Sequence, residues 1–402
     1  MDNGEVIDEV LVSFFKAPNS YTTEDMCEIN SHGGIYVVRR ILEVCLKNGA
    51  KLAEPGEFTK RAFLNGRLDL AQAESVIDII NAKTEKEAQS SIHQLEGFLS
   101  KKINKIREKL MSIMVDIEVS IDYPEYDVED VENKKAYTIL NEVENQLVEL
   151  QKSFQTGKII KEGIKVALIG KPNAGKSSLL NAILKEERAI VTDIEGTTRD
   201  TIEESVKIAG IPIHIIDTAG IRNATNEVEK IGIEKSKKMI EMADLIIAIF
   251  DITNDVEQED KEILKLIKDK KAIIVLNKID LSNEVKENEI FKKYKNESEI
   301  IKLSAKEYVG MESLYKKIEE MFQLEEIKLD NQEIITNIRH KNIIDNALNN
   351  ILEAKKVILE NMPIDIIAIN IKEAMEELAK ITGENISDDI IKEIFAKFCL
   401  GK

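Results

Sequence analysis

A short run near the middle of the chain has the residue types and spacing of a phosphate-binding loop. Gly170-Lys171-Pro172-Asn173-Ala174-Gly175-Lys176-Ser177 fits the pattern G-x-x-x-x-G-K-[ST], between an apolar strand-like run and a helix-like one. The glycines let backbone N–H groups turn toward phosphates, Lys176 supplies charge to the β- and γ-oxygens, and the Ser177 hydroxyl is expected to bind Mg²⁺. A chance match is roughly a 1% event in a chain this long. The loop therefore predicts a nucleoside triphosphate site.

Two further motifs suit the γ-phosphate end of such a site. Gly196-Thr197-Thr198-Arg199-Asp200 precedes a predicted strand, and the Thr198 hydroxyl is expected to complete the Mg²⁺ shell and sense the γ-phosphate. Asp217-Thr218-Ala219-Gly220 ends a predicted strand. Its carboxylate would hold Mg²⁺ through water, and its glycine N–H would reach the γ-phosphate.

The remaining motifs select the base. Asn277-Lys278-Ile279-Asp280 ends a predicted strand, and the Asp280 carboxylate can accept hydrogen bonds from the guanine ring N–H and amino group. Adenine offers no such donor pair, and an unpaired buried carboxylate would disfavour ATP by several powers of ten. Ser304-Ala305-Lys306 completes the base pocket. The site is predicted to bind GTP, with an ATPase as the alternative.

The residues expected to contact GTP all lie in these loops. They are Asn173, Ala174, Gly175, Lys176, Ser177, Ser178, Thr192, Asp193, Ile194, Glu195, Gly196, Thr197, Thr198, Asp217, Thr218, Ala219, Gly220, Asn277, Lys278, Asp280, Ser304, Ala305 and Lys306.

Hydrolysis must differ from the Ras-like scheme, because the position of the water-orienting glutamine is occupied by Ile221. Asn173 lies in the phosphate loop next to a switch loop that begins at Ala189. It can help bind a monovalent cation beside the phosphates, where the charge would replace an arginine finger. The alternative is that Asn173 only shapes the loop.

The elements that must position these loops alternate between strands and helices from Ile164 to Phe322. The predicted strands are continuous apolar runs, which favours a parallel sheet covered by helices on both faces. We expect a Ras-like P-loop G domain over residues 163–322. Its strands are predicted at 165–169, 211–216, 245–250, 272–276 and 300–303.

The flanking segments have a different texture. Apolar residues recur at spacings of three and four over 68–160, with a helix predicted near 131–154, and again over 325–402. Residues 1–67 combine a β-like run with turn residues, which indicates a small α+β unit. The predicted fold class is multidomain α/β plus all-α, with the G domain inserted between two halves of one helical domain.

Composition limits the function classes. The chain has 402 residues, which is long for a single core, and three widely spaced cysteines, which indicates a reducing compartment. It has no membrane-length apolar run and no signal-peptide pattern, so the cytoplasm is expected. The net charge of −18 disfavours broad nucleic-acid contact, so any RNA contact must be local or shared with a partner.

With these residues in hand, the chain resembles the MnmE/TrmE family of tRNA modification GTPases almost end to end. The resemblance rests on Tyr21-Thr22-Thr23-Glu24-Asp25, the run Pro55–Gly66, the G motifs, and the closing Phe398-Cys399-Leu400-Gly401-Lys402. Family members carry about fifty residues ahead of the point where this chain begins, including part of a folate pocket.

The resemblance implies a K⁺-stimulated GTPase that acts with an MnmG-type FAD protein, as a heterotetramer, on C5 of the wobble uridine of certain tRNAs. It implies K⁺ ligands at Asn173, Thr192, Ile194 and Thr197, and Glu229 as the residue that positions the attacking water, with Lys176 as a further catalytic residue. Cys399 is implied to matter for modification.

The resemblance also implies a homodimer and a first domain that binds a 5-formyltetrahydrofolate-type donor through Glu28, Arg67 and Lys402. A carboxylate suits the pterin amino and ring N–H groups, and cations suit folate oxygens. Two alternatives stay open. One is an Era-like regulatory or ribosome-assembly GTPase, which would more often carry a basic RNA-binding domain. The other is a folate-binding structural partner.

Overall fold

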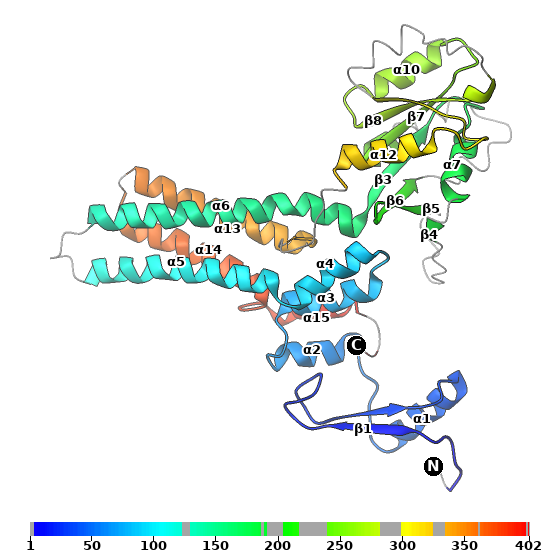
Figure 1. Cartoon of the computed structure of the whole chain (residues 1–402). Coiled ribbons are helices and arrows are strands. Elements are labelled where there is room, and N and C mark those ends of the chain that lie inside the picture. The colour runs from blue at the N-terminus through cyan, green and yellow to red at the C-terminus, as the bar shows by residue number, and fades with distance from the viewer. Residues whose placement is uncertain are drawn as a thin grey trace. The chain divides into compact units, whose positions relative to one another are not determined.

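The computed structural model describes residues 4–122, 129–185, 189–190, 204–216, 239–281, 299–324, 334–360, 362–398 and 401 (Figure 1). The chain divides into two compact units. One contains Met1–Ala82, Ala88–Phe154 and Glu333–Lys402, and the other contains Lys83–Glu87 and Gln155–Gln332. Among the described helices, none has the length and apolarity needed to cross a membrane.

The first unit begins with a small α+β segment, as its composition predicts. Strands β1 (Leu11–Phe15) and β2 (Met26–Asn30) form an antiparallel hairpin in which Phe15 lies opposite Met26. Helices α1 (Ile35–Lys47) and α2 (Glu57–Leu64) follow. The hairpin loop is tied to α2, because the Tyr21 hydroxyl lies 2.9 Å from the Thr59 hydroxyl.

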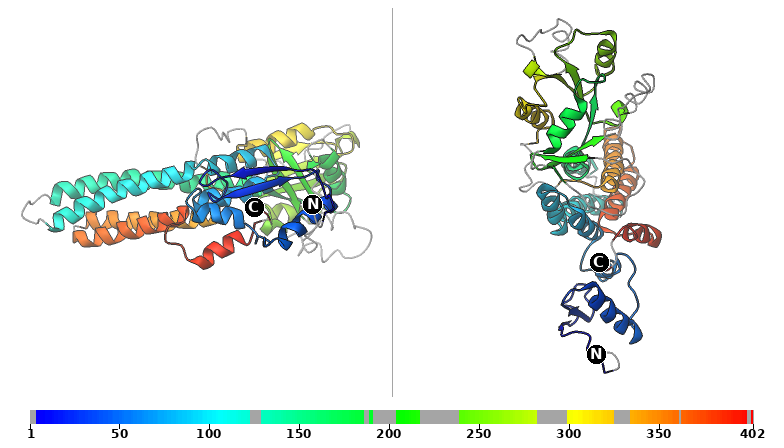
Figure 2. Two further views of the ribbon diagram at one scale, coloured as in Figure 1. Left: turned by 90° about the horizontal axis from the view of Figure 1, so that it is seen from below. Right: turned by 90° about the vertical axis from the view of Figure 1, so that its right-hand side faces the viewer.

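The rest of the first unit is helical. Its longest helices lie side by side in Figure 1 and in the left-hand view of Figure 2, and they share one apolar core, in which Ile106, Leu147 and Ile371 are fully buried. That core draws residues from before and after the G domain, because burying both amphipathic faces removes more apolar surface from water than either half can alone. The helices are α3 (Leu70–Asn81), α4 (Glu85–Leu95), α5 (Phe98–Asp122), α6 (Glu129–Glu162), α13 (Ile338–Leu359), α14 (Ile364–Thr382) and α15 (Asp388–Phe395). The start of α4, through Glu87, and the end of α6, from Gln155, belong to the second unit.

Helix α6 is longer than the sequence predicts. The periodicity suggests an end near Phe154, before Gly157, but the helix continues to Glu162. A mid-helix glycine costs about 1 kcal/mol relative to alanine. Complete burial of Ile160 beyond it contributes more than that cost, so tertiary packing decides the boundary.

The second unit contains a seven-stranded sheet in the order β4-β5-β6-β3-β7-β8-β9. Strands β6, β3, β7, β8 and β9 are parallel, and β5 runs antiparallel to both β4 and β6. The strands are β3 (Ile164–Ile169), β4 (Ala189–Ile190), β5 (Glu204–Ile208), β6 (Ile211–Ile216), β7 (Leu245–Asp251), β8 (Ala272–Asn277) and β9 (Glu299–Lys302). The helices include α7 (Lys176–Lys185), α10 (Gln258–Leu266) and α12 (Met311–Phe322).

The expected fold class is confirmed, with one addition at the sheet edge. The fully apolar runs predict the central parallel strands to within a residue or so. The antiparallel edge is not predicted, because β5 carries Glu204 and Lys207 and buries only alternate residues such as Val206 and Ile208. Such a short half-buried strand gives a weak signal.

Candidate functional site

The phosphate-binding loop joins β3 directly to α7, and its two glycines are required by close contacts. A Cβ on Gly170 would lie 2.4 Å from the Ile249 carbonyl oxygen, and one on Gly175 would lie 2.0 Å from Asn277 Nδ2. Gly175 also has φ of 101°, which disfavours side chains. The backbone can therefore pack against both neighbours only because these positions lack side chains.

Lys176 begins α7, and its ammonium group turns back into the loop. Nζ donates to the carbonyl oxygens of Gly170 and Lys171, both at 2.7 Å. Burial lowers the pKa of Lys176. An approaching phosphate would stabilise the charged form, so this ammonium is placed to bind an anion at the loop.

Asn277 holds the phosphate loop to the loop after β9. It is 2% exposed, its Nδ2 donates to the Ala174 carbonyl at 3.0 Å, and its Oδ1 accepts from the Ala305 N–H at 3.1 Å. Both ends of the amide are therefore engaged with loop backbone. The sequence assigns Asn277 to GTP contact, and the structure shows that it positions two of the predicted binding loops.

The predicted base-binding residues lie at the carboxyl ends of β8 and β9. Lys278 Nζ donates to Asp251 Oδ2 at 2.6 Å, and this contact, with those of Thr253, outweighs burial and lowers the pKa of Asp251. Asp280 lies in a short 3-10 helix (Ile279–Leu281) and is exposed. An exposed carboxylate at this edge is accessible to a guanine ring.

The other described residues of the predicted nucleotide site differ in their exposure to solvent. Asn173, Ser177, Ser178 and Lys306 are exposed, whereas Ser304 and Ala305 are buried. Asn173 has φ of 62°, a conformation that asparagine tolerates better than most residues. Within the described residues no group of three or more His, Cys, Asp or Glu side chains is arranged to hold a metal.

Several predicted residues lie outside the described part of the chain. They are Thr192, Asp193, Ile194, Glu195, Gly196, Thr197, Thr198, Asp217, Thr218, Ala219, Gly220, Glu229, Cys399 and Lys402.

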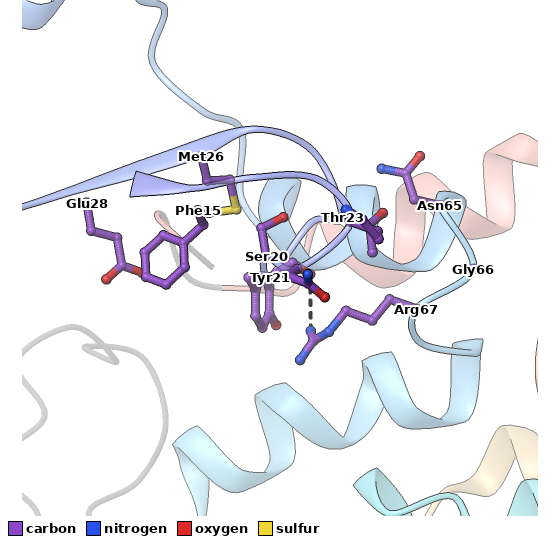
Figure 3. Close-up of a pocket in the computed structure, with 11 residues that line it drawn as sticks. Phe15, Ser20, Tyr21, Thr23, Met26, Glu28, Asn65, Gly66 and Arg67 are labelled. Atoms are coloured by element: carbon purple, nitrogen blue, oxygen red, sulfur yellow. Dashed lines mark hydrogen bonds between the residues drawn. The ribbon is translucent and has the colours of Figure 1, made fainter. Parts of the chain in front are cut away.

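A second candidate site lies in the first unit and brings Glu28 and Arg67 together (Figure 3). The pocket has a volume of about 630 Å³ and is formed by the hairpin, its loop, and the turn after α2. Phe15, Tyr21 and Met26 give it apolar walls, and in Figure 3 the two aromatic rings are seen between Glu28 and Arg67. A carboxylate and a guanidinium flanking aromatic rings suit a planar, polar-edged ligand.

Arg67 is held in place by Tyr21. Its Nη1 donates to the Tyr21 carbonyl oxygen at 3.1 Å, and its guanidinium carbon lies 4.8 Å from the centre of the Tyr21 ring. The first contact is drawn in Figure 3. A cation over an aromatic face is favourable, so the ring orients the charge before a ligand arrives. The sequence alone gives no sign of this role for Tyr21, although Tyr21 lies in one of the motifs that carry the resemblance.

The chain just before Cys399 is fixed against the same part of the first unit. Phe398 is 5% exposed and packs in a cluster with Phe395 and Phe63. A Cβ on Gly56 would lie 2.9 Å from Phe398 Cβ. The absent side chain at Gly56 therefore lets α2 accept the end of the chain.

Comparison with known protein families accounts for nearly the whole chain. The family described as the MnmE helical domain matches residues 70–399, and the one described as the GTP-binding protein TrmE N-terminus matches residues 1–67. A tRNA modification GTPase MnmE from Acetivibrio thermocellus is 50% identical over 401 residues, covering 100% of this chain and 87% of the relative. The Clostridioides difficile protein of the same name is 48% identical over 402 residues, with the same coverage.

Among solved structures, Era in complex with MgGDPNP and a 16S ribosomal RNA segment is 27% identical. The match covers 46% of this chain and 66% of the Era chain, with a TM-score of 0.31. The MnmE relatives, in contrast, match the whole chain, and the family match spans most of it. This chain is therefore a GTP hydrolase that belongs to the MnmE (TrmE) family of tRNA modification GTPases.

Proposed function

We propose that this GTPase is K⁺-stimulated, works in the cytoplasm with an MnmG-type FAD protein, and modifies C5 of the wobble uridine of certain tRNAs. The product would be an aminomethyl- or carboxymethylaminomethyl-type uridine. The strongest support is the loop arrangement in which Lys176, Asn277 and Ala305 converge, in a chain about half identical to named tRNA modification GTPases. The net charge of −18 gives the chain little attraction for tRNA, which favours a shared binding surface with the partner.

The nucleotide is proposed to bind with its phosphates at the N-terminus of α7 and its base at the edge formed by Asp280 and Lys306. The N–H groups at a helix N-terminus attract anions, and Lys176 adds a full charge. The hydroxyl of Ser177 at the start of α7 suits Mg²⁺ as one ligand, with Thr198 as the other proposed protein ligand. Mg²⁺ would neutralise charge that develops on the phosphate oxygens.

A K⁺ ion is proposed to occupy a site beside the phosphates, with Asn173, Thr192, Ile194 and Thr197 as ligands. Asn173 suits this role, because it is exposed in the phosphate loop and its side-chain amide oxygen can bind a cation. A monovalent cation there would stabilise negative charge that develops in the transition state, in place of an arginine finger. Glu229 is proposed to position the attacking water.

Replacing Asn173 with alanine is expected to lower kcat for GTP hydrolysis about tenfold to a hundredfold in K⁺, while GTP affinity changes less than threefold. The wild-type chain should show a similar loss when Na⁺ replaces K⁺, because the two changes remove the same charge. Steady-state phosphate release in matched K⁺ and Na⁺ buffers measures both effects. Equal wild-type rates in the two salts would contradict the cation role.

The pocket of the first unit is proposed to bind a 5-formyltetrahydrofolate-type one-carbon donor. Glu28 would accept hydrogen bonds from the pterin amino and ring N–H groups, and Arg67 would pair with folate oxygens or carboxylates. Lys402 is proposed to contribute a further cation, and the family homodimer would present two such pockets. Cys399 is proposed to take part in the modification chemistry, and the residue before it, Phe398, is buried in the same unit as the pocket.

Replacing Arg67 with alanine is expected to weaken binding of 5-formyltetrahydrofolate about tenfold to a hundredfold, as expected for loss of a charge-assisted hydrogen bond. Arg61→Ala is the matched control, because Arg61 pairs with Glu57 and Glu24 but does not line the pocket. Isothermal titration with the wild type and both variants makes the comparison. If the wild-type chain gives no binding heat with 5-formyltetrahydrofolate, the folate proposal is refuted.

The tRNA function is tested by mass spectrometry of nucleosides from a strain that lacks this gene. Loss of the modified wobble uridine, restored by the wild-type gene but not by a Cys399→Ser gene, is the expected result. Unchanged wobble uridines in the deletion strain would refute the proposal. Cosedimentation of the protein with ribosomal subunits would instead favour an Era-like role.

A further inference from the structure

The phosphate loop contains two lysines, and the structure gives them different partners. Lys176 turns into the loop, whereas Lys171 extends to α10. Lys171 Nζ lies 2.7 Å from Asp260 Oδ2 and 2.8 Å from Glu257 Oε2. Two carboxylates therefore neutralise the Lys171 charge, and that ammonium is not placed to serve the phosphates.

The inner half of this contact is buried. The Lys171 side chain is 17% exposed and the Asp260 side chain 6%, whereas Glu257 is 68% exposed. Ion pairs in low-dielectric surroundings are sensitive to loss of either partner, because the remaining charge is left uncompensated. The Asp260 contact is therefore the one that can hold Lys171, and Glu257 contributes at the rim.

Asp260 is itself fixed by its helix. It lies in the first turn of α10, where its Oδ2 also accepts from the Glu257 N–H at 2.9 Å as part of a capping box. A carboxylate is favoured at this end of a helix dipole. The fully buried Leu264 and Ile267 pack this segment into the sheet core with residues of β7 and β8. The helix that carries Asp260 is therefore fixed to the sheet by its buried apolar face.

Lys171 transmits that anchorage to Lys176 through its backbone. The Lys171 carbonyl oxygen accepts from Lys176 Nζ at 2.7 Å, and it also accepts from the Ala174 N–H at 3.3 Å. The side chain of Lys171 thus fixes one end of the residue while its carbonyl holds the ammonium that the phosphates would meet. A displacement of about 1 Å in such a group can change affinity or rate up to a hundredfold.

We propose that Asp260, acting through Lys171, is a positioning residue that sets the place of the Lys176 ammonium for GTP. This inference rests on the proposed role of Lys176 in phosphate binding. Neither Asp260 nor the Lys171 side chain needs to touch the nucleotide, so the pair acts from the far side of the loop.

The test measures the Kd of the full-length chain for a fluorescent N-methylanthraniloyl GTP, together with kcat. Asp260→Asn and Lys171→Met are each expected to weaken binding about tenfold, and the double variant is expected to be no weaker than either alone. Lys171→Arg should retain most of the affinity, because it preserves the ion pair. Glu259→Gln is the matched control, since it removes an exposed charge from the same helix turn and should leave Kd unchanged.

A second cycle separates positioning from general destabilisation. In a Lys176→Met background, Asp260→Asn should have no further effect on Kd, because the ammonium that it positions is gone. If Asp260→Asn weakens binding equally in both backgrounds, or lowers only the unfolding temperature, the positioning role is refuted. If Lys176→Met alone keeps wild-type affinity, the proposed phosphate contact fails, and that outcome also removes the basis for the Asp260 role.

Discussion

Replacing Gly175 with alanine is expected to weaken GTP binding at least about a hundredfold. The added Cβ would lie 2.0 Å from Asn277 Nδ2, and that amide cannot turn aside without losing its hydrogen bonds to Ala174 and Ala305. The substitution would therefore displace the phosphate loop from the loop after β9. Fluorescence titration with a guanine nucleotide measures the loss.

Gly210→Ala is the matched control for Gly175→Ala. Gly210 also has a positive φ, 79°, but a Cβ there would meet only Lys86 carbons, at 3.6 Å or more. This control includes the backbone strain, about 1 kcal/mol, without the clash in the site. Gly210→Ala should unfold at a slightly lower temperature and bind GTP normally. Equal loss of affinity in both variants would show that strain, and not the Asn277 contact, is responsible.

Replacing Glu74 with glutamine is expected to destabilise the helical part of the first unit by about 3 kcal/mol at pH 7. Glu74 Oε1 and Oε2 accept from Arg339 Nε and Nη2 at 3.0 and 2.7 Å, and Oε2 lies 2.9 Å from Nε2 of the buried His340. Burial raises the pKa of Glu74, but His340 and Arg339 outweigh it and lower the pKa to about 2. The difference between this pKa and the ordinary value of 4.5 sets the size of the expected loss of stability.

The pH dependence has a definite sign. A carboxyl whose pKa is lower in the folded state stabilises the protein above its unfolded pKa, and that contribution is lost as the pH falls through the folded value. The difference between wild type and Glu74→Gln should therefore be constant above about pH 5 and shrink between about pH 4.5 and 2. Burial raises the pKa of nearby Asp69, which offsets part of the wild-type acid loss without altering the difference between the two proteins.

Calorimetry of the full-length chain measures this difference, with Glu384→Gln as control. Glu384 also pairs with an arginine through both oxygens, at 2.6 and 2.8 Å from Arg107, but its side chain is 53% exposed. Exposed pairs contribute about 0–1 kcal/mol, so this variant should unfold close to wild type. If the two variants lose equal stability, burial is not what makes the Glu74 cluster important.

The features of this protein that depend on neighbouring residues can be predicted from its sequence. The phosphate loop needs glycines, a lysine and a hydroxyl at fixed spacing, so Gly170, Lys176 and Ser177 can be identified without a structure. The buried parallel strands are equally visible, because a strand covered on both faces must be apolar throughout. The resemblance carried by the motifs near Tyr21 and Phe398 names the family, and the comparisons confirm it.

Tertiary structure decided what depends on residues far apart in the chain. Lys171 and Asp260 are ordinary surface types in sequence, and Glu74 pairs with Arg339 across 265 positions. The sequence predicts that Asn277 contacts GTP. In the structure its buried side chain joins the phosphate loop to the loop after β9. A side chain's spacing along the chain fixes its face on a strand or helix, but its charge partner and dielectric surroundings exist only once distant elements pack. For that reason the sequence determined the family and the nucleotide loop. The fold alone determined which charged side chains hold that loop and the helices in place.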